Sequence, residues 1–187
     1  MKKIPLLLCI ATLVTLTACN EDGTIKGDQT DMNETSTHDD MDHSGHSSSG
    51  DVPEGLQEAE EPRFQVGSDA VIQTDHMEDM NGAQATISGA YDTTVYAISY
   101  QPTNGGEKIT HHKWVVHEEL DYAGAEPLET GDKAIIDTDH MAGMNGTEAT
   151  IESTEQTTVY MVDFTPVSGG DRIMNHKWVT EDELRTP

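Results

Sequence analysis

The chain has 187 residues, which is enough for one or two domains. Its 35 acidic residues against 10 Lys and Arg give a formal net charge of −25, which disfavours nucleic acid and anionic lipid as electrostatic partners because phosphate contacts need clustered basic residues. Such a surface attracts cations instead. The only two cysteines, Cys9 and Cys19, lie near the N-terminus, so a disulfide framework and a Cys-based zinc site are excluded.

Residues 1–18 have the pattern of a lipoprotein signal peptide. Two lysines precede an apolar stretch from Ile4 to Leu16 that is too short for a comfortable membrane span. It ends in Leu16-Thr17-Ala18-Cys19, which resembles a bacterial lipobox. We therefore predict lipidation at Cys19 and a lipid anchor on the extracellular face of the cell membrane. The alternative is an ordinary signal peptide that happens to contain a cysteine.

Residues 19–62 follow the signal peptide. Their composition, acidic and with almost no large apolar residues, predicts a disordered tether. Within nine residues it carries three imidazoles and one thioether, those of His38, Met41, His43 and His46. Imidazole suits copper, zinc and nickel, whereas thioether selects Cu(I). We predict a metal site here; the alternative is a solvated tether with incidental histidines.

Beyond the tether the chain repeats itself. Gly67 to Leu120 aligns without a gap to Gly131 to Leu184 at an offset of 64, and 27 of the 54 pairs are identical, so the chain contains an internal duplication. Thr74-Asp75-His76-Met77, for example, recurs as Thr138-Asp139-His140-Met141. We predict two modules, residues 63–121 and 122–187.

Each copy predicts short β-strands separated by turns. In the first copy we expect strands at Ala70 to Thr74, at Ala85 to Ser88 and at Thr94 to Tyr100. A hairpin turn at Asn104-Gly105-Gly106 precedes two more, near Lys108 to Thr110 and at Lys113 to Val116. Glu118 to Leu120 allows one helical turn. The predicted fold class is all-β, with two tandem small SH3-like β-barrel modules, since closure would remove exposed edges.

Histidine and methionine recur at fixed positions in both copies. His76, Met77 and Met80 precede a glycine turn, as do His140, Met141 and Met144, while His112 and His176 each precede a Lys-Trp pair. Polar and small neighbours make the methionines poor core residues, so we predict that each module binds a metal through its His-Met loop, closed by His112 or His176 from another strand. The alternative is that the methionines cap the barrel and His112 bonds to a backbone carbonyl.

Copper is the favoured cofactor, Cu(I) above Cu(II) or zinc, because thioethers keep Cu(I) affinity in a compartment where thiols oxidise. The lipobox, the acidic His-rich tether and the doubled Asp-His-Met-x-x-Met-Asn-Gly and His-Lys-Trp-Val motifs resemble the YdhK-like lipoproteins of Gram-positive bacteria, a family that includes the staphylococcal copper-resistance lipoprotein CopL. The resemblance implies SH3-like modules, a surface lipoprotein and extracellular copper binding. Where the family has Asn-His-Lys-Trp, the first copy has His111-His112-Lys113-Trp114.

The sequence therefore predicts a membrane-anchored extracellular copper-binding lipoprotein that sequesters copper for copper tolerance and is not an enzyme. Its predicted partners are metal ions and the membrane, not nucleic acid. The alternative is a cell-wall or protein-interaction module without a metal role, which would present an exposed aromatic groove near Tyr96, Tyr100 and Trp114. A zinc or nickel scavenger is a variant of the first hypothesis. No catalytic Ser/His/Asp or Cys/His order and no phosphate-binding loop stands out.

Overall fold

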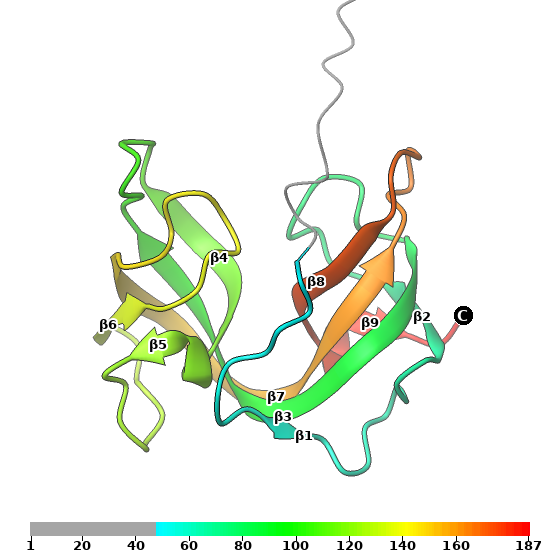
Figure 1. Cartoon of the computed structure of the whole chain (residues 1–187), viewed down its shortest axis with the longest axis horizontal. Coiled ribbons are helices and arrows are strands. Elements are labelled where there is room, and N and C mark those ends of the chain that lie inside the picture. The colour runs from blue at the N-terminus through cyan, green and yellow to red at the C-terminus, as the bar shows by residue number, and fades with distance from the viewer. Residues whose placement is uncertain (1–47) are drawn as a thin grey trace, which may run out of the picture. The chain divides into compact units, whose positions relative to one another are not determined.

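A computed structural model describes residues 48–187. These residues form one antiparallel sheet of nine strands, and their only helical elements are short 3-10 turns (Figure 1). The all-β prediction is confirmed. The sheet is not closed on itself, so the expected SH3-like barrels are not confirmed. Within residues 48–187 no helix has the length and apolar character needed to cross a membrane. The signal peptide, Cys19 and the tether residues His38, Met41, His43 and His46 lie outside the described residues.

Two long strands, β3 (Gln84–Tyr100) and β7 (Glu148–Phe164), organise the sheet. They occupy equivalent places in the two repeats and pair antiparallel along nearly their whole length, with Thr93 opposite Thr157, its own counterpart in the other repeat. The two repeats are therefore related by an approximate two-fold axis that passes between these threonines.

The remaining strands come in the same order in both repeats. The first repeat contains β2 (Asp69–Ile72), β4 (Ile109–Val116), the 3-10 turn η2 (His117–Glu119) and β5 (Leu120–Asp121). The second contains β6 (Lys133–Ile136), β8 (Ile173–Thr180), η3 (Glu181–Glu183) and β9 (Leu184–Arg185). The strand β1 (Gln57–Glu58) precedes both and pairs with the middle of β3.

The pairing of these strands interlocks the repeats. Strand β5 of the first repeat pairs with β6 of the second, and β9 of the second pairs with β2 of the first. Each compact half of the sheet therefore takes strands from both repeats. We call lobe 1 the half built from β4, β5, β6, the second half of β3 and the first half of β7. Lobe 2 is the half built from β2, β8, β9, the first half of β3 and the second half of β7.

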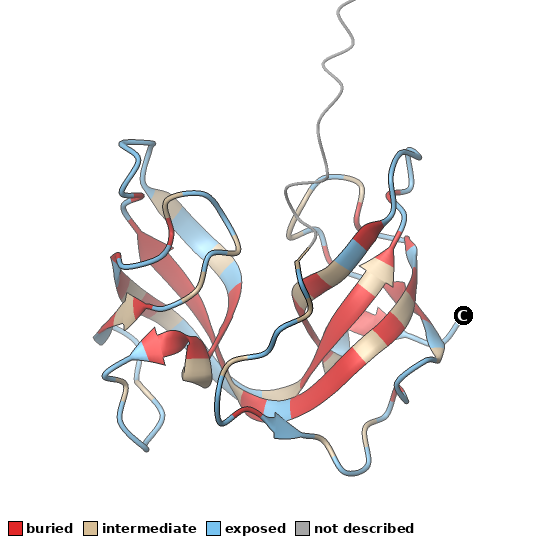
Figure 2. Ribbon diagram, in the orientation of Figure 1, coloured by how far each residue is buried: buried red, intermediate tan, exposed pale blue. Residues whose placement is uncertain are grey.

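Each lobe has its own hydrophobic core (Figure 2). Met144 packs with Tyr96, Ile98 and Tyr100 in lobe 1, and the equivalent Met80 packs with Tyr160, Val162 and Phe164 in lobe 2. A third buried cluster joins the lobes; it contains Leu56, Tyr91, Val95, Ala97, Trp114, Val116, Val159, Met161 and Trp178. The alternation of large residues along β3 and β7 fills these cores, as expected for strands with a buried face.

The last part of the predicted tether packs against the repeats. Besides β1, Leu56 is buried in the central cluster, and the segment Ser48–Asp51 lies along β8. Ser48 donates its backbone N–H to the Met174 carbonyl at 3.0 Å and its hydroxyl to the Asn175 carbonyl at 2.7 Å. Part of the segment predicted as tether is therefore ordered against the repeats, with Leu56 as its buried apolar residue.

Candidate functional site

A cleft of about 710 Å³ lies between the two lobes. Six of the eight histidines and methionines predicted as ligands within the repeats line this cleft. Lobe 1 contributes His112, His140 and Met141; lobe 2 contributes His76, Met77 and His176. The sequence predicted that each module binds a metal and left open whether the two modules share a site; the structure brings both sets of residues to one cleft.

Met80 and Met144 do not line the cleft. Both are fully buried, in the cores of lobe 2 and lobe 1. The chain reverses between the two methionines of each loop, because Asp79 and the equivalent Gly143 adopt left-handed backbone conformations, with φ of 61° and 81°. The turn sends the first methionine toward the cleft and the second into the core, so the two sulfurs do not share one side.

Two carboxylates, the buried Glu119 and the half-buried Glu183, anchor the histidine loops. Glu119, in η2, accepts a hydrogen bond from His140 Nε2 at 2.8 Å, and Glu183, in η3, accepts one from His76 Nε2 at 2.8 Å. Each of these pairs joins one residue from each repeat. Only 2% of the Glu119 side chain and 14% of the Glu183 side chain are exposed.

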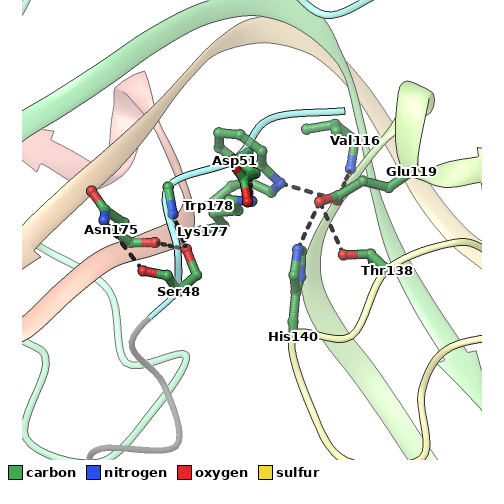
Figure 3. A network of polar contacts seen from close by, with 10 residues as sticks. Ser48, Asp51, Val116, Glu119, Thr138, His140, Asn175, Lys177 and Trp178 are labelled. Atoms are coloured by element: carbon green, nitrogen blue, oxygen red, sulfur yellow. Dashed lines mark hydrogen bonds and ion pairs between the residues drawn. The ribbon is translucent and has the colours of Figure 1, made fainter. Parts of the chain in front are cut away.

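Tryptophans from the opposite lobe complete the two carboxylate sites. Trp178 Nε1 donates to Glu119 at 3.0 Å (Figure 3), and Trp114 Nε1 donates to Glu183 at 2.8 Å. The peptide bonds that precede both tryptophans are cis. Lys113 and Lys177 lie over the indole rings of the adjacent tryptophans, with their ammonium nitrogens 4.7 and 5.6 Å from the ring centroids.

The carboxylates keep their negative charge despite burial. Burial is the largest influence on the pKa of Glu119 and raises it, but His140 and the Trp178 and Val116 hydrogen bonds outweigh it, so the net pKa is lowered. The pKa of Glu183 is likewise raised by burial, and hydrogen bonding to His76 together with the other donors brings it down to about 2. At neutral pH both carboxylates are therefore ionised and can only accept hydrogen bonds.

His112 lies close to both histidine loops. Its ring centroid is 6.3 Å from that of His140 and 6.0 Å from that of Tyr100. Burial lowers the pKa of His112 to about 4, helped by repulsion from His140 and His76 and opposed by Glu119. The imidazole is consequently neutral at pH 7 and keeps a lone pair available to a cation.

Three imidazole nitrogens in this region are buried without a hydrogen-bond partner: Nδ1 of His76, Nε2 of His112 and Nδ1 of His140. Buried polar atoms are usually satisfied, so each orphan nitrogen needs an explanation. Among residues 48–187, however, no three His, Cys, Asp or Glu side chains are grouped tightly enough to hold an ion. An ion shared between the lobes would have to draw the histidine loops closer together.

Sequence reasoning missed Glu119 and Glu183. It treated their segment only as one helical turn. The pattern that identifies them is internal: this glutamate is identical in the two repeats, while its neighbours change from His117-Glu118 to Glu181-Asp182. His117 and Glu181 occupy equivalent positions and bond to equivalent tyrosines, Tyr96 and Tyr160, outside the cleft.

Comparison with known proteins gives the family. The family model described as "Protein of unknown function (DUF1541)" matches residues 66–117 and again residues 130–181. The chain belongs to the DUF1541 family. It is 51% identical over 179 residues to "Uncharacterized protein YdhK" of Bacillus subtilis (strain 168), a match that covers 95% of this chain and 86% of that protein. The predicted YdhK-like family and the internal duplication are both confirmed.

Solved structures of the Bacillus subtilis protein resemble this fold. A crystal structure of the DUF1541 family protein ydhK superposes with a TM-score of 0.74 at 55% identity, covering 80% of this chain and all of that one. A solution NMR structure of the ydhK C-terminal domain superposes with a TM-score of 0.63 at 55% identity, covering 65% of this chain and 92% of that one.

Proposed function

We propose that this DUF1541 protein is a membrane-anchored lipoprotein that binds copper outside the cell, in the cleft between its lobes, and so sequesters the ion for copper tolerance. The observation that carries the proposal is the set of three buried imidazole nitrogens without a hydrogen-bond partner, on His76, His112 and His140 at this cleft. Neutral imidazole is a ligand for copper, zinc and nickel.

Two thioethers favour copper over the other ions. Met77 and Met141 line the same cleft, one from each lobe, and 36% of Met141 is exposed. Thioether is a soft ligand that selects Cu(I), whereas zinc gains little from it. Asp51 and Asp139 also lie on the cleft wall, and the net charge of −25 raises the local concentration of cations. The proposed ligand set is therefore His76, Met77, His112, His140, Met141 and His176, without Met80 and Met144.

The proposed role is binding without chemical turnover, and the protein is proposed not to be an enzyme. The tether histidines His38, His43 and His46, with Met41, form a second and weaker copper site in the proposal, because ordering a flexible segment around an ion costs conformational entropy. Zn(II) and Cu(II) are the other ions that this imidazole-rich segment would take.

A protein-interaction role without metal receives no such support. That alternative expects an exposed aromatic groove, yet Tyr96, Tyr100 and Trp114 are 0%, 2% and 5% exposed. Their aromatic faces belong to the buried clusters of lobe 1 and the centre of the sheet. We therefore propose no peptide-binding function for these residues.

The test is a Cu(I) competition titration on the chain from residue 20 onward, with His38, His43 and His46 changed to Gln so that only the cleft competes for copper. Replacing His76, His112 and His140 with Gln in that background should lower Cu(I) affinity by more than about tenfold, which corresponds to about 1.4 kcal/mol. His117→Gln is the matched control, since His117 bonds to Tyr96 outside the cleft. Equal affinity of the triple variant and its parent would rule out the cleft site.

The lipid anchor is tested separately. In the proposal, Cys19 carries the acyl chains that hold the protein at the membrane. Cys19→Ser should release the protein from the membrane fraction, and intact mass should show a lipid adduct on the wild type alone. A wild-type mature chain that carries no lipid would remove the anchor from the proposal and leave the copper site untouched.

A further inference from the structure

Glu119 and Glu183 occupy equivalent positions and accept the same four kinds of hydrogen bond. On Glu119, one oxygen accepts from Trp178 Nε1 and from the Val116 backbone N–H at 3.1 Å, and the other accepts from His140 Nε2 and from the Thr138 hydroxyl at 3.2 Å (Figure 3). The four partners surround the carboxylate, so neither oxygen is left to serve an ion in the cleft.

The same arrangement recurs in lobe 2. Glu183 accepts from His76 Nε2, Trp114 Nε1, the Thr180 backbone N–H and the Thr74 hydroxyl. The full partner set is present in both lobes, although the repeats differ at 27 of their 54 aligned positions. It points to a task that both histidine loops share.

The hydrogen bonds determine which imidazole nitrogen carries the proton. An ionised carboxylate only accepts, so the histidine nitrogen that faces it must donate. His76 and His140 face their carboxylates through Nε2. In its neutral form each imidazole therefore carries its proton on Nε2 and its lone pair on Nδ1. Nδ1 is the buried nitrogen of both histidines that has no hydrogen-bond partner.

We propose that Glu119 and Glu183 are positioning residues of the metal site, which hold His140 and His76 in the Nε2–H tautomer so that each offers Nδ1 to an ion bound between the lobes. The inference rests on the proposed function. A carboxylate that accepts the second N–H of a ligating histidine fixes the tautomer and the orientation of the ring and raises the basicity of the ligand nitrogen. His112, on β4, presents a third buried nitrogen without a hydrogen-bond partner, Nε2.

The opposing view is that the carboxylates serve only to hold the tryptophans. Glu119→Gln separates the two. Trp178 Nε1–H and the Val116 N–H can only donate, so they require the amide oxygen of the glutamine. The amide NH₂ must then face His140 Nε2 and donate to it, which places the imidazole proton on Nδ1. The tryptophan contact survives in this variant, while the tautomer of His140 reverses.

The experiment combines ¹⁵N NMR of the histidine side chains at pH 8, without metal, with Cu(I) competition titration against a chromogenic chelator. Both use the chain from residue 20 with the three tether histidines changed to Gln. We expect Nε2–H at His140 in the parent, Nδ1–H in Glu119→Gln, and Cu(I) affinity lower in the variant by about 10- to 100-fold. His117→Gln is the matched control: it replaces an imidazole that bonds to Tyr96 outside the cleft, and it should change neither the tautomer of His140 nor, beyond about threefold, the affinity.

Several outcomes would overturn the inference. An Nδ1–H proton on His140 in the parent would do so, as would an unchanged tautomer in Glu119→Gln or a reversed tautomer with unchanged Cu(I) affinity. In each of these cases copper binding by the parent would leave the proposed function standing. A parent that binds no Cu(I) would instead overturn the proposed function itself. If Glu119→Gln does not fold, Glu183→Gln repeats the test at His76, where 14% of the carboxylate side chain is exposed.

Discussion

The two methionines of each histidine loop allow one loop to serve as its own control. Met77 and Met141 line the cleft, whereas Met80 and Met144, three residues later, are fully buried in the lobe cores. We therefore compare the double variant Met77→Leu, Met141→Leu with the double variant Met80→Leu, Met144→Leu. Leucine keeps the apolar character and nearly the volume of methionine and removes only the sulfur as a ligand.

The two double variants should rank in opposite orders for affinity and for stability. Loss of the cleft sulfurs should lower Cu(I) affinity by at least about tenfold, or about 1.4 kcal/mol, and leave Zn(II) affinity unchanged because zinc gains little from thioether. Partly exposed positions usually change stability by no more than about 0.5 kcal/mol each. The core substitutions should leave Cu(I) affinity unchanged but cost up to about 1.5 kcal/mol each through repacking.

The measurements are Cu(I) competition titration and urea unfolding, both on the chain from residue 20 with the tether histidines replaced. The Cu(I) titrations are carried out far below the urea midpoint of each variant, so that every variant is folded when its affinity is measured. The reasoning is refuted if the core variant loses as much Cu(I) affinity as the cleft variant, or if the cleft variant binds Cu(I) like its parent.

Three further outcomes are expected. Lowering the pH from 7 to 4.5 should reduce the free energy of unfolding, measured in urea, by about 2–3 kcal/mol through His112: its folded pKa of about 4 lies below the usual histidine value of about 6.5, so the unfolded chain binds the extra proton. Glu183 affects stability over a lower pH range, because its folded pKa of about 2 lies below the usual value for glutamate. Its stabilising contribution is fully present above about pH 4.5 and is lost as the pH falls further toward 2. Trp178→Phe should destabilise the fold in urea by at least about 2 kcal/mol, and by more than Trp114→Phe, because it removes a donor from the more deeply buried carboxylate, Glu119.

Local patterns predicted the fold class and the turns, because they depend on neighbouring residues. The duplication and the His-Met loops are visible in the chain, and the Gly105 turn lies between β3 and β4 as expected. The strand lengths were less accessible. Residues 85–88 and 94–100 were expected to be separate strands, but both belong to the single strand β3. The intervening residues, Gly89 to Thr93, were not predicted as a strand, yet they are extended in the structure and pair with β7 and β1.

The shared cleft could not be predicted from the repeat pattern. Two copies with the same alternation can pair strands within a repeat or exchange them between repeats, and both arrangements bury the same faces. The choice is made by contacts far apart in the chain, such as β2 with β9 and β5 with β6. Sequence reasoning therefore identified six residues that line the cleft but left open whether the two modules share a site.

Interlocking also accounts for one set of side chains that is identical in the two copies. Each His–Glu pair joins the two repeats, and each Glu accepts from a Trp of the opposite lobe, so a change at one of these positions disturbs contacts made by both copies. His117 and Glu181 differ, yet each bonds to the hydroxyl of its own tyrosine, Tyr96 or Tyr160, at 2.8 and 3.2 Å. Either side chain can accept from a tyrosine hydroxyl. The side chains of the two carboxylate networks, which come from both copies, are therefore identical in the repeats, whereas His117 and Glu181 differ because either side chain satisfies the tyrosine of its own copy.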